Sequence, residues 1–106
     1  MTEDKNIFHK REFDAAALEK IANILKAISH PVRLDIIRVL EEMEPLTVAQ
    51  INVRIPVEQS LLSHHLTKMK DKGVLKSTRE GKNIYYRMAS RHITAMFDCM
   101  EKCDLV

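Results

Sequence analysis

Apolar residues recur every three or four positions early in the chain, which is the spacing of a helix with one buried face. Between residues 15 and 28 this stripe contains Leu18, Ile21 and Leu25. Asp14 precedes the stripe at the position of an N-terminal cap. The pattern therefore predicts a helix over 15–28.

Two further helices are predicted before the middle of the chain. The first covers residues 31–42, because Pro31 suits a first helical position, where an N–H group would have no partner in any case. Thr47 and Gln50 have the spacing of a capping box, in which each side chain bonds the other residue's backbone N–H group. A short helix over 48–54 should follow.

A fourth predicted helix starts after Val57 and ends before Gly73, a residue that favours helix termination. Its apolar face contains Leu62, Leu66 and Met69 at helical spacing. A separate face carries short, hydrogen-bonding side chains and no acid. Its members are Gln59, Ser60, Ser63, His64 and Thr67.

Two short strands are predicted next, over 74–78 and 84–88, joined by the basic turn 79–83. The pattern of two helices followed by a hairpin predicts a mainly α fold of the winged helix-turn-helix type, with five helices and a small β-hairpin wing. Residues 14–106 would form this domain, and residues 1–13 are polar and predict a flexible segment.

The last helix is predicted over 91–103, with Ser90 as its cap. A chain of 106 residues has a small core, in which both terminal helices are hard to bury. We therefore expect these helices to form a homodimer interface, the alternative being a monomer with a compact five-helix core. The expected interface residues are Leu18, Ile21, Leu25, Ile93, Met96, Phe97 and Met100.

Positive charge is concentrated in the helix–hairpin unit. Residues 59–91 hold eight basic and two acidic residues, whereas the whole chain has a formal charge of +2. A basic patch beside a polar helix face is typical of nucleic-acid binding, and the alternative is an ordinary solvated surface. The helix–glycine–hairpin arrangement favours nucleic acid.

Composition narrows the class of protein further. The length indicates one domain, and no apolar run approaches the ~20 residues of a membrane span. The first residues lack the order of a signal peptide, and two cysteines make no disulfide framework, so we expect a cytoplasmic protein. Phosphate-binding loops and nucleophile-elbow motifs are missing from the sequence, which argues against an enzyme.

The segments SHPVRLDIIRVL, TVAQI, QSLLSHHLTKMKDKGVL and REGKNIYYRM, in this order, resemble the ArsR/SmtB family of bacterial transcriptional repressors over residues 14–103. The resemblance implies a homodimer that binds palindromic operator DNA and releases it on sensing an inducer. The family's DNA contacts fall on Gln59, Ser60, Ser63 and His64, and its wing contacts near Arg79 and Lys82. With the helix residues Thr67 and Lys68 these form the predicted DNA-binding set, and His65 is expected to pack instead.

The family's metal sites are only partly matched. The cysteine positions on the short helix are Thr47 and Ala49 here, and on the last helix only His92 and Cys103 stand at ligand positions. Zinc generally takes four protein or solvent ligands, so we expect no resident cofactor, with His92 and Cys103 as weak metal candidates. Cys99 and Cys103 are either a thiol or soft-metal sensor pair or small apolar residues of the interface. A winged-helix module that binds proteins rather than DNA is the remaining functional alternative.

Overall fold

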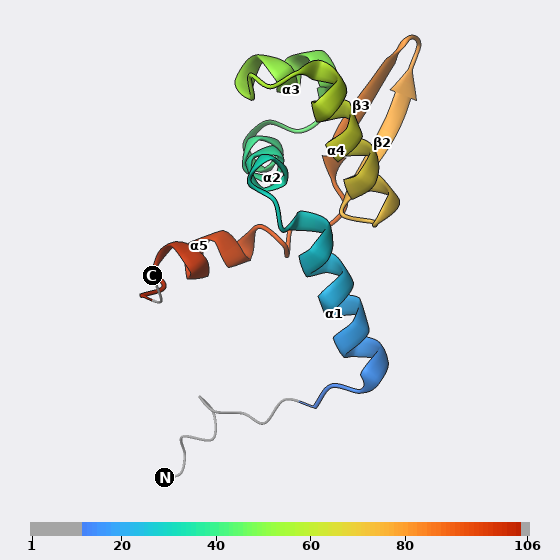
Figure 1. The fold of residues 1–106 in the computed structure, drawn as a ribbon. Helices are drawn as coiled ribbons and strands as arrows, with labels where there is room; N and C mark the ends of the chain where they lie inside the picture. The colour runs from blue at the N-terminus through green and yellow to red at the C-terminus, as the bar shows by residue number, and fades with distance from the viewer. Residues whose placement is uncertain (1–11, 105–106) are drawn as a thin grey trace.

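The structure, a computed structural model, describes residues 12–104, which form five helices and one three-stranded antiparallel sheet (Figure 1). In chain order the elements are α1 (Ala15–Ile28), α2 (Pro31–Met43), β1 (Leu46–Thr47), α3 (Val48–Arg54), α4 (Gln59–Asp71), β2 (Leu75–Glu80), β3 (Asn83–Met88) and α5 (Ala95–Glu101). The predicted flexible segment 1–13 lies outside the described residues except for its last two positions.

The helix caps expected from the sequence are present. Asp14 accepts a hydrogen bond from the Ala17 N–H group at 2.8 Å and so begins α1. Thr47 and Gln50 bond each other's backbone N–H groups at 3.2 and 2.9 Å, which completes the capping box of α3. Local hydrogen-bonding chemistry thus determines where both helices start.

One apolar core lies between α2, α3, α4 and the sheet. The expected apolar face of α4 is fully buried, with Leu62, Leu66 and Met69 all at 0% exposure. Several core residues were not anticipated, and the main ones are Ile36, Val39, Leu46, Ile55, Val74, Tyr86 and Met88. The core holds α4 firmly by one face and leaves its other face to solvent.

The sheet has the strand order β1–β3–β2, and the hairpin is longer than predicted. Glu80 pairs with Asn83, so only Gly81 and Lys82 form the turn, rather than residues 79–83. Gly81 has φ +65°, a conformation that glycine adopts without strain and that suits the first central position of a two-residue hairpin turn. The prediction ended the first strand two residues too early and began the second one residue too late, because the polar residues beside the turn are paired although they are exposed.

The last helix also differs from its prediction. It begins at Ala95 rather than Arg91, and ends at Glu101 rather than Cys103. The residues before it make i→i+3 bonds, such as Thr94 N–H to the Arg91 carbonyl at 3.3 Å, so this segment winds more tightly than an α-helix. The prediction of Ser90 as the cap of this helix was wrong: the N-cap is Thr94, which makes no side-chain cap. Ser90 instead accepts from the His92 N–H group at 3.2 Å, in the turn before the helix.

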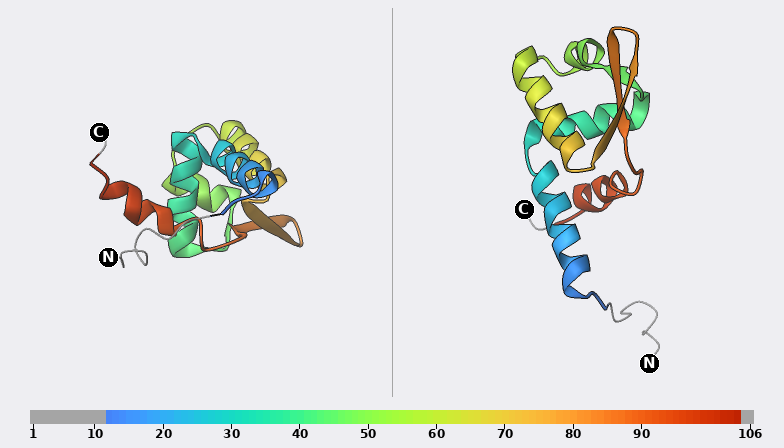
Figure 2. Two further views of the ribbon diagram at one scale, coloured as in Figure 1. Left: turned by 90° about the horizontal axis from the view of Figure 1, so that it is seen from below. Right: turned by 90° about the vertical axis from the view of Figure 1, so that its right-hand side faces the viewer.

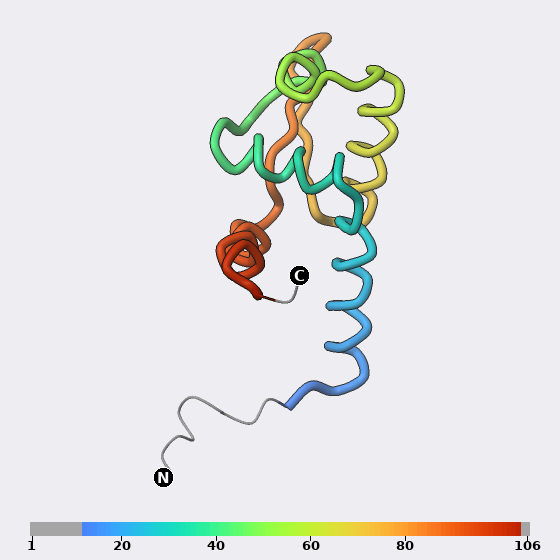
Figure 3. Tube along the Cα trace, turned by 60° about the vertical axis from the view of Figure 1, so that its left-hand side comes forward, coloured from blue at the N-terminus to red at the C-terminus, as the bar shows by residue number. Residues whose placement is uncertain are grey.

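The terminal helices extend away from the core (Figures 1 and 2). Only the last turn of α1 is buried, at Ala27 and Ile28, while Leu18, Ile21 and Leu25 are 54%, 39% and 50% exposed. The tube view shows α5 beside α2, at the end of the molecule from which α1 projects (Figure 3). Both helices therefore lie at the opposite end from the tip of the hairpin.

Candidate nucleic-acid interface

The solvent face of α4 carries the polar side chains predicted from the sequence. Ser63 is half-buried, and the other five residues of the expected set on this helix are exposed. These five are Gln59, Ser60, His64, Thr67 and Lys68. Glu58 precedes the helix without making a side-chain cap, so the first N–H groups of α4 have no side-chain partner. The helix thus presents both hydrogen-bonding side chains and free backbone donors.

The hairpin presents its two predicted residues beside this helix. Arg79 lies in β2 opposite Ile84, and Lys82 lies in the turn; both are exposed. β2 packs against α4, and the start of α4 and the tip of the hairpin point to the same end of the molecule (Figures 1 and 2). The structure therefore brings the start of the predicted helix set and the predicted wing residues to the same end of the molecule.

Most of the positive charge of the helix–hairpin unit has no ion-pair partner within the described part of the chain. Of the eight basic residues in 59–91, Arg91 pairs with Glu44 at 2.7 Å and bonds the Glu41 carbonyl at 3.1 Å, which ties the end of β3 to α2. The other seven are exposed and make no ion pair with another described residue, namely Lys68, Lys70, Lys72, Lys76, Arg79, Lys82 and Arg87. Lys76 and Arg87 even face each other across the hairpin. Like charges in that position repel, and an anion would relieve the repulsion.

His65 is buried in the protein, as its position on α4 predicted. Its side chain is 4% exposed, and its Nδ1 atom accepts a hydrogen bond from Arg33 Nε at 2.9 Å. The His30 ring lies 4.4 Å away and the His64 ring 5.9 Å away, measured between centroids. Burial lowers the pKa of His65, and the charges of His30, Arg33 and His64 lower it further. The ring is therefore a neutral packing group at neutral pH.

The sequence did not identify the role of Arg33. Its position off the apolar stripe of α2 was equally compatible with surface solvation, which is what Arg38 shows. Arg33 instead reaches two partners that are 6 and 32 residues away in the chain. The one signal in the sequence was the predicted packing position of His65 on α4. A buried ring nitrogen needs a hydrogen-bond partner, and here α2 supplies it.

The candidate metal and thiol residues are not brought together. Among residues 12–104, no group of three or more His, Cys, Asp or Glu side chains could hold a metal ion. His92 is exposed, with Nδ1 3.4 Å from the Ser90 hydroxyl. Cys99 and Cys103 are free and exposed, and Cys103 lies just beyond α5, so the expected pair on one helix face is not formed. No helix in the described part of the chain is long and apolar enough to cross a membrane.

An apolar surface covers the terminal helices. Leu18, Ile21, Leu25 and Met100 are exposed, and the other expected interface residues, Ile93, Met96 and Phe97, are half-buried. A groove of about 320 Å³ separates α1 from α5, lined by Leu25, Ile28, Ser29, Leu34, Met96, Phe97 and Met100. Exposed apolar side chains in such number are typical of an interaction surface.

The chain is similar to known bacterial regulators in sequence. The profile of the family described as "Bacterial regulatory protein, arsR family" matches residues 30–77. The transcriptional repressor PagR of Bacillus anthracis is 40% identical over 80 residues, which are 76% of this chain and 80% of PagR. The biofilm growth-associated repressor of Xylella fastidiosa is 33% identical over 88 residues, covering 83% of this chain and 76% of that protein.

Solved structures agree with the sequence matches. The crystal structure of PagR superposes with a TM-score of 0.74 at 36% identity, covering 82% of this chain and 99% of PagR. The homodimeric winged helix-turn-helix DNA-binding domain of Mb0332 from Mycobacterium bovis gives a TM-score of 0.72 at 26% identity, covering 88% of this chain and 85% of that one. The predicted winged helix-turn-helix fold is thereby confirmed.

Proposed function

Because this chain belongs to the arsR family of bacterial regulatory proteins, we propose that it is a repressor that binds operator DNA through α4 and the β2–β3 wing. The observation that carries this proposal is an acid-free polar face on α4, which packs beside the hairpin, in a unit with seven exposed basic residues that have no ion-pair partner in the described chain. Such a surface suits the phosphates and base edges of DNA and offers little to an apolar protein partner.

Each part of the surface has a separate task in this proposal. α4 would enter the major groove, where Gln59 suits adenine and Ser60, Ser63 and His64 suit base edges or phosphates. Thr67 and Lys68, which lie further along α4, would contact the sugar–phosphate backbone of the DNA. Arg79 and Lys82 on the wing would bind phosphates without regard to sequence. Lys76 and Arg87 add attraction from the outer face of the hairpin.

The same proposal includes a homodimer. The apolar surface of α1 and α5 would be covered by the same surface of a second chain, which is how a two-fold symmetric interface is built. Two α4 helices at a fixed spacing would then read two half-sites of a palindromic operator. The relative Mb0332 is described as homodimeric, which supports this part of the proposal.

Selection of tight-binding duplexes from a random DNA pool tests the function. We expect repeated rounds with the wild-type protein to enrich a two-fold symmetric sequence, with half-sites about one helical turn apart. A control pool selected with the variant Ser60→Ala/Ser63→Ala/His64→Ala should enrich this sequence weakly. Retention of DNA without any enriched sequence would instead indicate a non-specific binder, and no retention at all would favour a protein-interaction module.

The exposed thiols suggest one route for release from DNA. Cys99 and Cys103 are accessible, and a bridge between the two chains of a dimer would change the α5 surface directly. Mild oxidation should then give a covalent dimer on a non-reducing gel and weaken DNA binding reversibly. The variant Cys99→Ser/Cys103→Ser is the matched control. If oxidation leaves both properties unchanged, while zinc releases the DNA, the inducer site lies elsewhere and includes a metal.

A further inference from the structure

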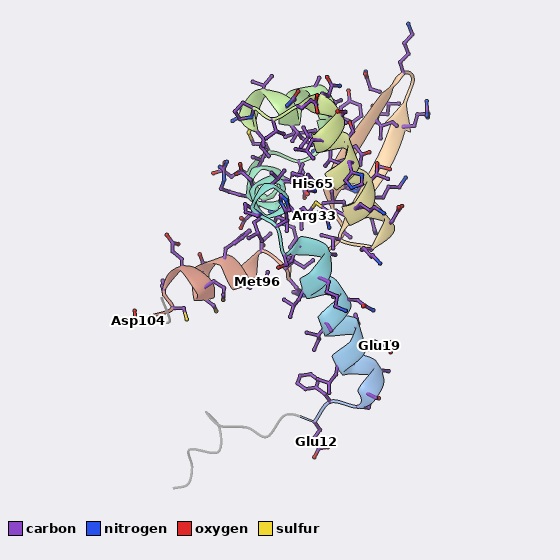
Figure 4. The ribbon with its side chains drawn as sticks, in the orientation of Figure 1. Glu12, Glu19, Arg33, His65, Met96 and Asp104 are labelled. Carbon is purple, nitrogen blue, oxygen red and sulfur yellow. The ribbon has the colours of Figure 1, made fainter. Side chains whose placement is uncertain are left out.

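The side chain of Arg33 connects three helices. It extends from α2, and its Nη1 atom donates to the carbonyl oxygen of Ala27 in the last turn of α1 at 3.0 Å. Its Nε atom donates to His65 Nδ1 on α4 at 2.9 Å. Figure 4 shows Arg33 and His65 side by side where α2, α4 and the end of α1 meet. Both partners are buried, Ala27 at 2% and His65 at 4% exposure.

The bond to Ala27 acts where α1 is attached to the rest of the chain. The last four carbonyl groups of a helix have no partner within it, and Ala27 is one of these in α1. A guanidinium group satisfies this oxygen and interacts favourably with the negative end of the helix dipole. Since only this last turn of α1 is buried, contacts here determine the direction in which the exposed part of α1 projects.

The bond to His65 acts on α4, the helix proposed to enter the major groove of DNA. His65 follows His64 and precedes Leu66, so it lies between the outward face of α4 and its buried face. A guanidinium is a planar group with donors in fixed directions. One rigid group thus links the end of α1 to the middle of α4.

We propose that Arg33 is a positioning residue for operator binding, because it fixes α4 relative to α1 and, in the dimer, sets the spacing between the two α4 helices. This inference rests on the proposed function as a DNA-binding dimer. Arg33 itself would not contact DNA, since its side chain is committed to Ala27 and His65.

The surroundings of the link favour a geometric role over a stabilising one. Because His65 accepts at Nδ1, the neutral ring carries its proton on Nε2, and this buried atom has no partner among the described residues. An unsatisfied buried donor is unfavourable, and an apolar side chain of similar size would avoid it. In this proposal the polar link serves to specify the arrangement of the helices, in place of a more stabilising apolar contact.

The first experiment compares two duplexes of the sequence selected by the wild-type protein, one with both half-sites and one with a single half-site. Arg33→Gln and Arg33→Lys should lose about tenfold or more in affinity for the two-site duplex, since simultaneous engagement of both sites requires the correct spacing. Affinity for the single half-site should change less than about twofold. Lysine retains the charge but lacks the planar group whose two nitrogens make the two hydrogen bonds, so it should fail as well.

Arg38→Gln is the matched control. Arg38 lies on the same helix, is exposed, and among residues 12–104 bonds only Asp35, one turn away. This variant should bind both duplexes like the wild type. Circular dichroism and light scattering are measured on each variant, and if Arg33→Gln does not fold, Arg33→Lys carries the comparison.

A distance measurement tests the geometry without DNA. Spin labels are placed at Asp71→Cys, the exposed last residue of α4, in a chain with Cys99→Ser and Cys103→Ser. We expect one narrow distance in the dimer, a broadened or shifted one with Arg33→Lys, and no change with Arg38→Gln.

The inference is overturned if Arg33→Lys keeps the narrow distance and prefers the two-site duplex as strongly as Arg38→Gln does. A parallel loss on both duplexes, matched to a loss of folded protein, also overturns it, because Arg33 would then only stabilise the fold. If the wild-type protein itself is monomeric or selects no sequence, the proposed function fails instead.

Discussion

Single side chains on α4 divide into those that face the proposed DNA and those that hold the helix in place. Ser60 and His64 are exposed on the face away from Leu62 and Leu66. Ser63 is half-buried and lies at the edge of that face. The division predicts different consequences for substitutions that are only one or two positions apart.

Alanine at Ser60, Ser63 or His64 should weaken binding to the selected operator more than binding to random DNA. A lost base-edge contact corresponds to about 1–3 kcal/mol, whereas a lost phosphate contact affects all sequences alike. Titration of both DNAs measures the difference. Asn23→Ala, an exposed amide on α1, is the control and should change neither affinity. Equal losses on both DNAs would mean that these side chains only orient the helix.

The lowered pKa of His65 predicts a pH dependence of stability. The folded protein holds the ring neutral, so the unfolded chain binds more protons once the pH falls below the ordinary value of 6.5. This contribution to stability is therefore complete above pH 6.5 and is lost progressively as the pH falls towards the lower pKa of the folded state. The charges that face the ring are His30, Arg33 and His64.

Denaturant titrations between pH 7.5 and 5 measure this effect. We expect the free energy of unfolding to fall with pH in the wild type, and to fall less steeply in His65→Gln, which cannot titrate. His92→Gln removes an exposed histidine instead and serves as the control. An identical pH slope in the wild type and His65→Gln would show that the buried ring does not titrate in this range.

Among the elements, the helices α1 to α4 are specified by signals within their own sequence and were predictable. Asp14 and the Thr47–Gln50 box mark helix starts through bonds within one turn, and the apolar period of α4 shows its buried face directly. β1 was not predictable, because a two-residue strand exists only through its pairing with Tyr85 and Tyr86 of β3. The same holds for the Arg33–His65 contact, which joins positions 32 residues apart.

The start of α5 shows how a distant contact changes a local pattern. Ser90 has the character of a cap, and the apolar period from Ile93 onward is helical, so the sequence predicts a helix from Arg91. In the fold, the Arg91 side chain pairs with the Glu44 carboxylate and donates to the Glu41 carbonyl. The chain passes this point in tight turns and becomes an α-helix only at Ala95.

The wing is the element whose contribution depends most on salt. If Arg79 and Lys82 contact phosphates, the logarithm of affinity falls linearly with the logarithm of salt concentration. Arg79→Ala or Lys82→Ala should flatten this slope by about one unit each and weaken all DNA sequences about equally. Lys20→Ala removes the same charge from α1, away from the wing, and should leave the slope unchanged. If the slope in both wing variants equals that of the wild type, the hairpin does not contact DNA phosphates.

At the scale of the whole molecule, the terminal helices α1 and α5 leave apolar side chains exposed. Met96 and Phe97 pack partly against the core, so polar substitutions there would disturb both the protomer and its partner. Leu18 and Met100 are 54% and 64% exposed. A charged side chain at either position should therefore leave the fold of the protomer unchanged.

Leu18→Glu and Met100→Asp should therefore give a folded monomer in light scattering and circular dichroism, because a dimer would bury an unpaired charge. Affinity for the operator should fall with dimerisation, since one α4 helix reaches only one half-site. Lys20→Glu alters charge on the opposite face of α1 and should leave a dimer. A variant of Leu18 and Met100 together that remains dimeric would place the interface elsewhere.

The central claim is that α4 and the wing together distinguish one DNA sequence from others, and an equilibrium competition measures this most directly. The affinity of the wild-type protein is determined for the selected operator and for a duplex of the same composition in scrambled order, both at physiological salt. We expect the operator to bind at least about a thousandfold more tightly, the lower range for specific regulators. Equal affinity for the two duplexes would contradict the account, because the basic surface would then attract DNA without reading its sequence.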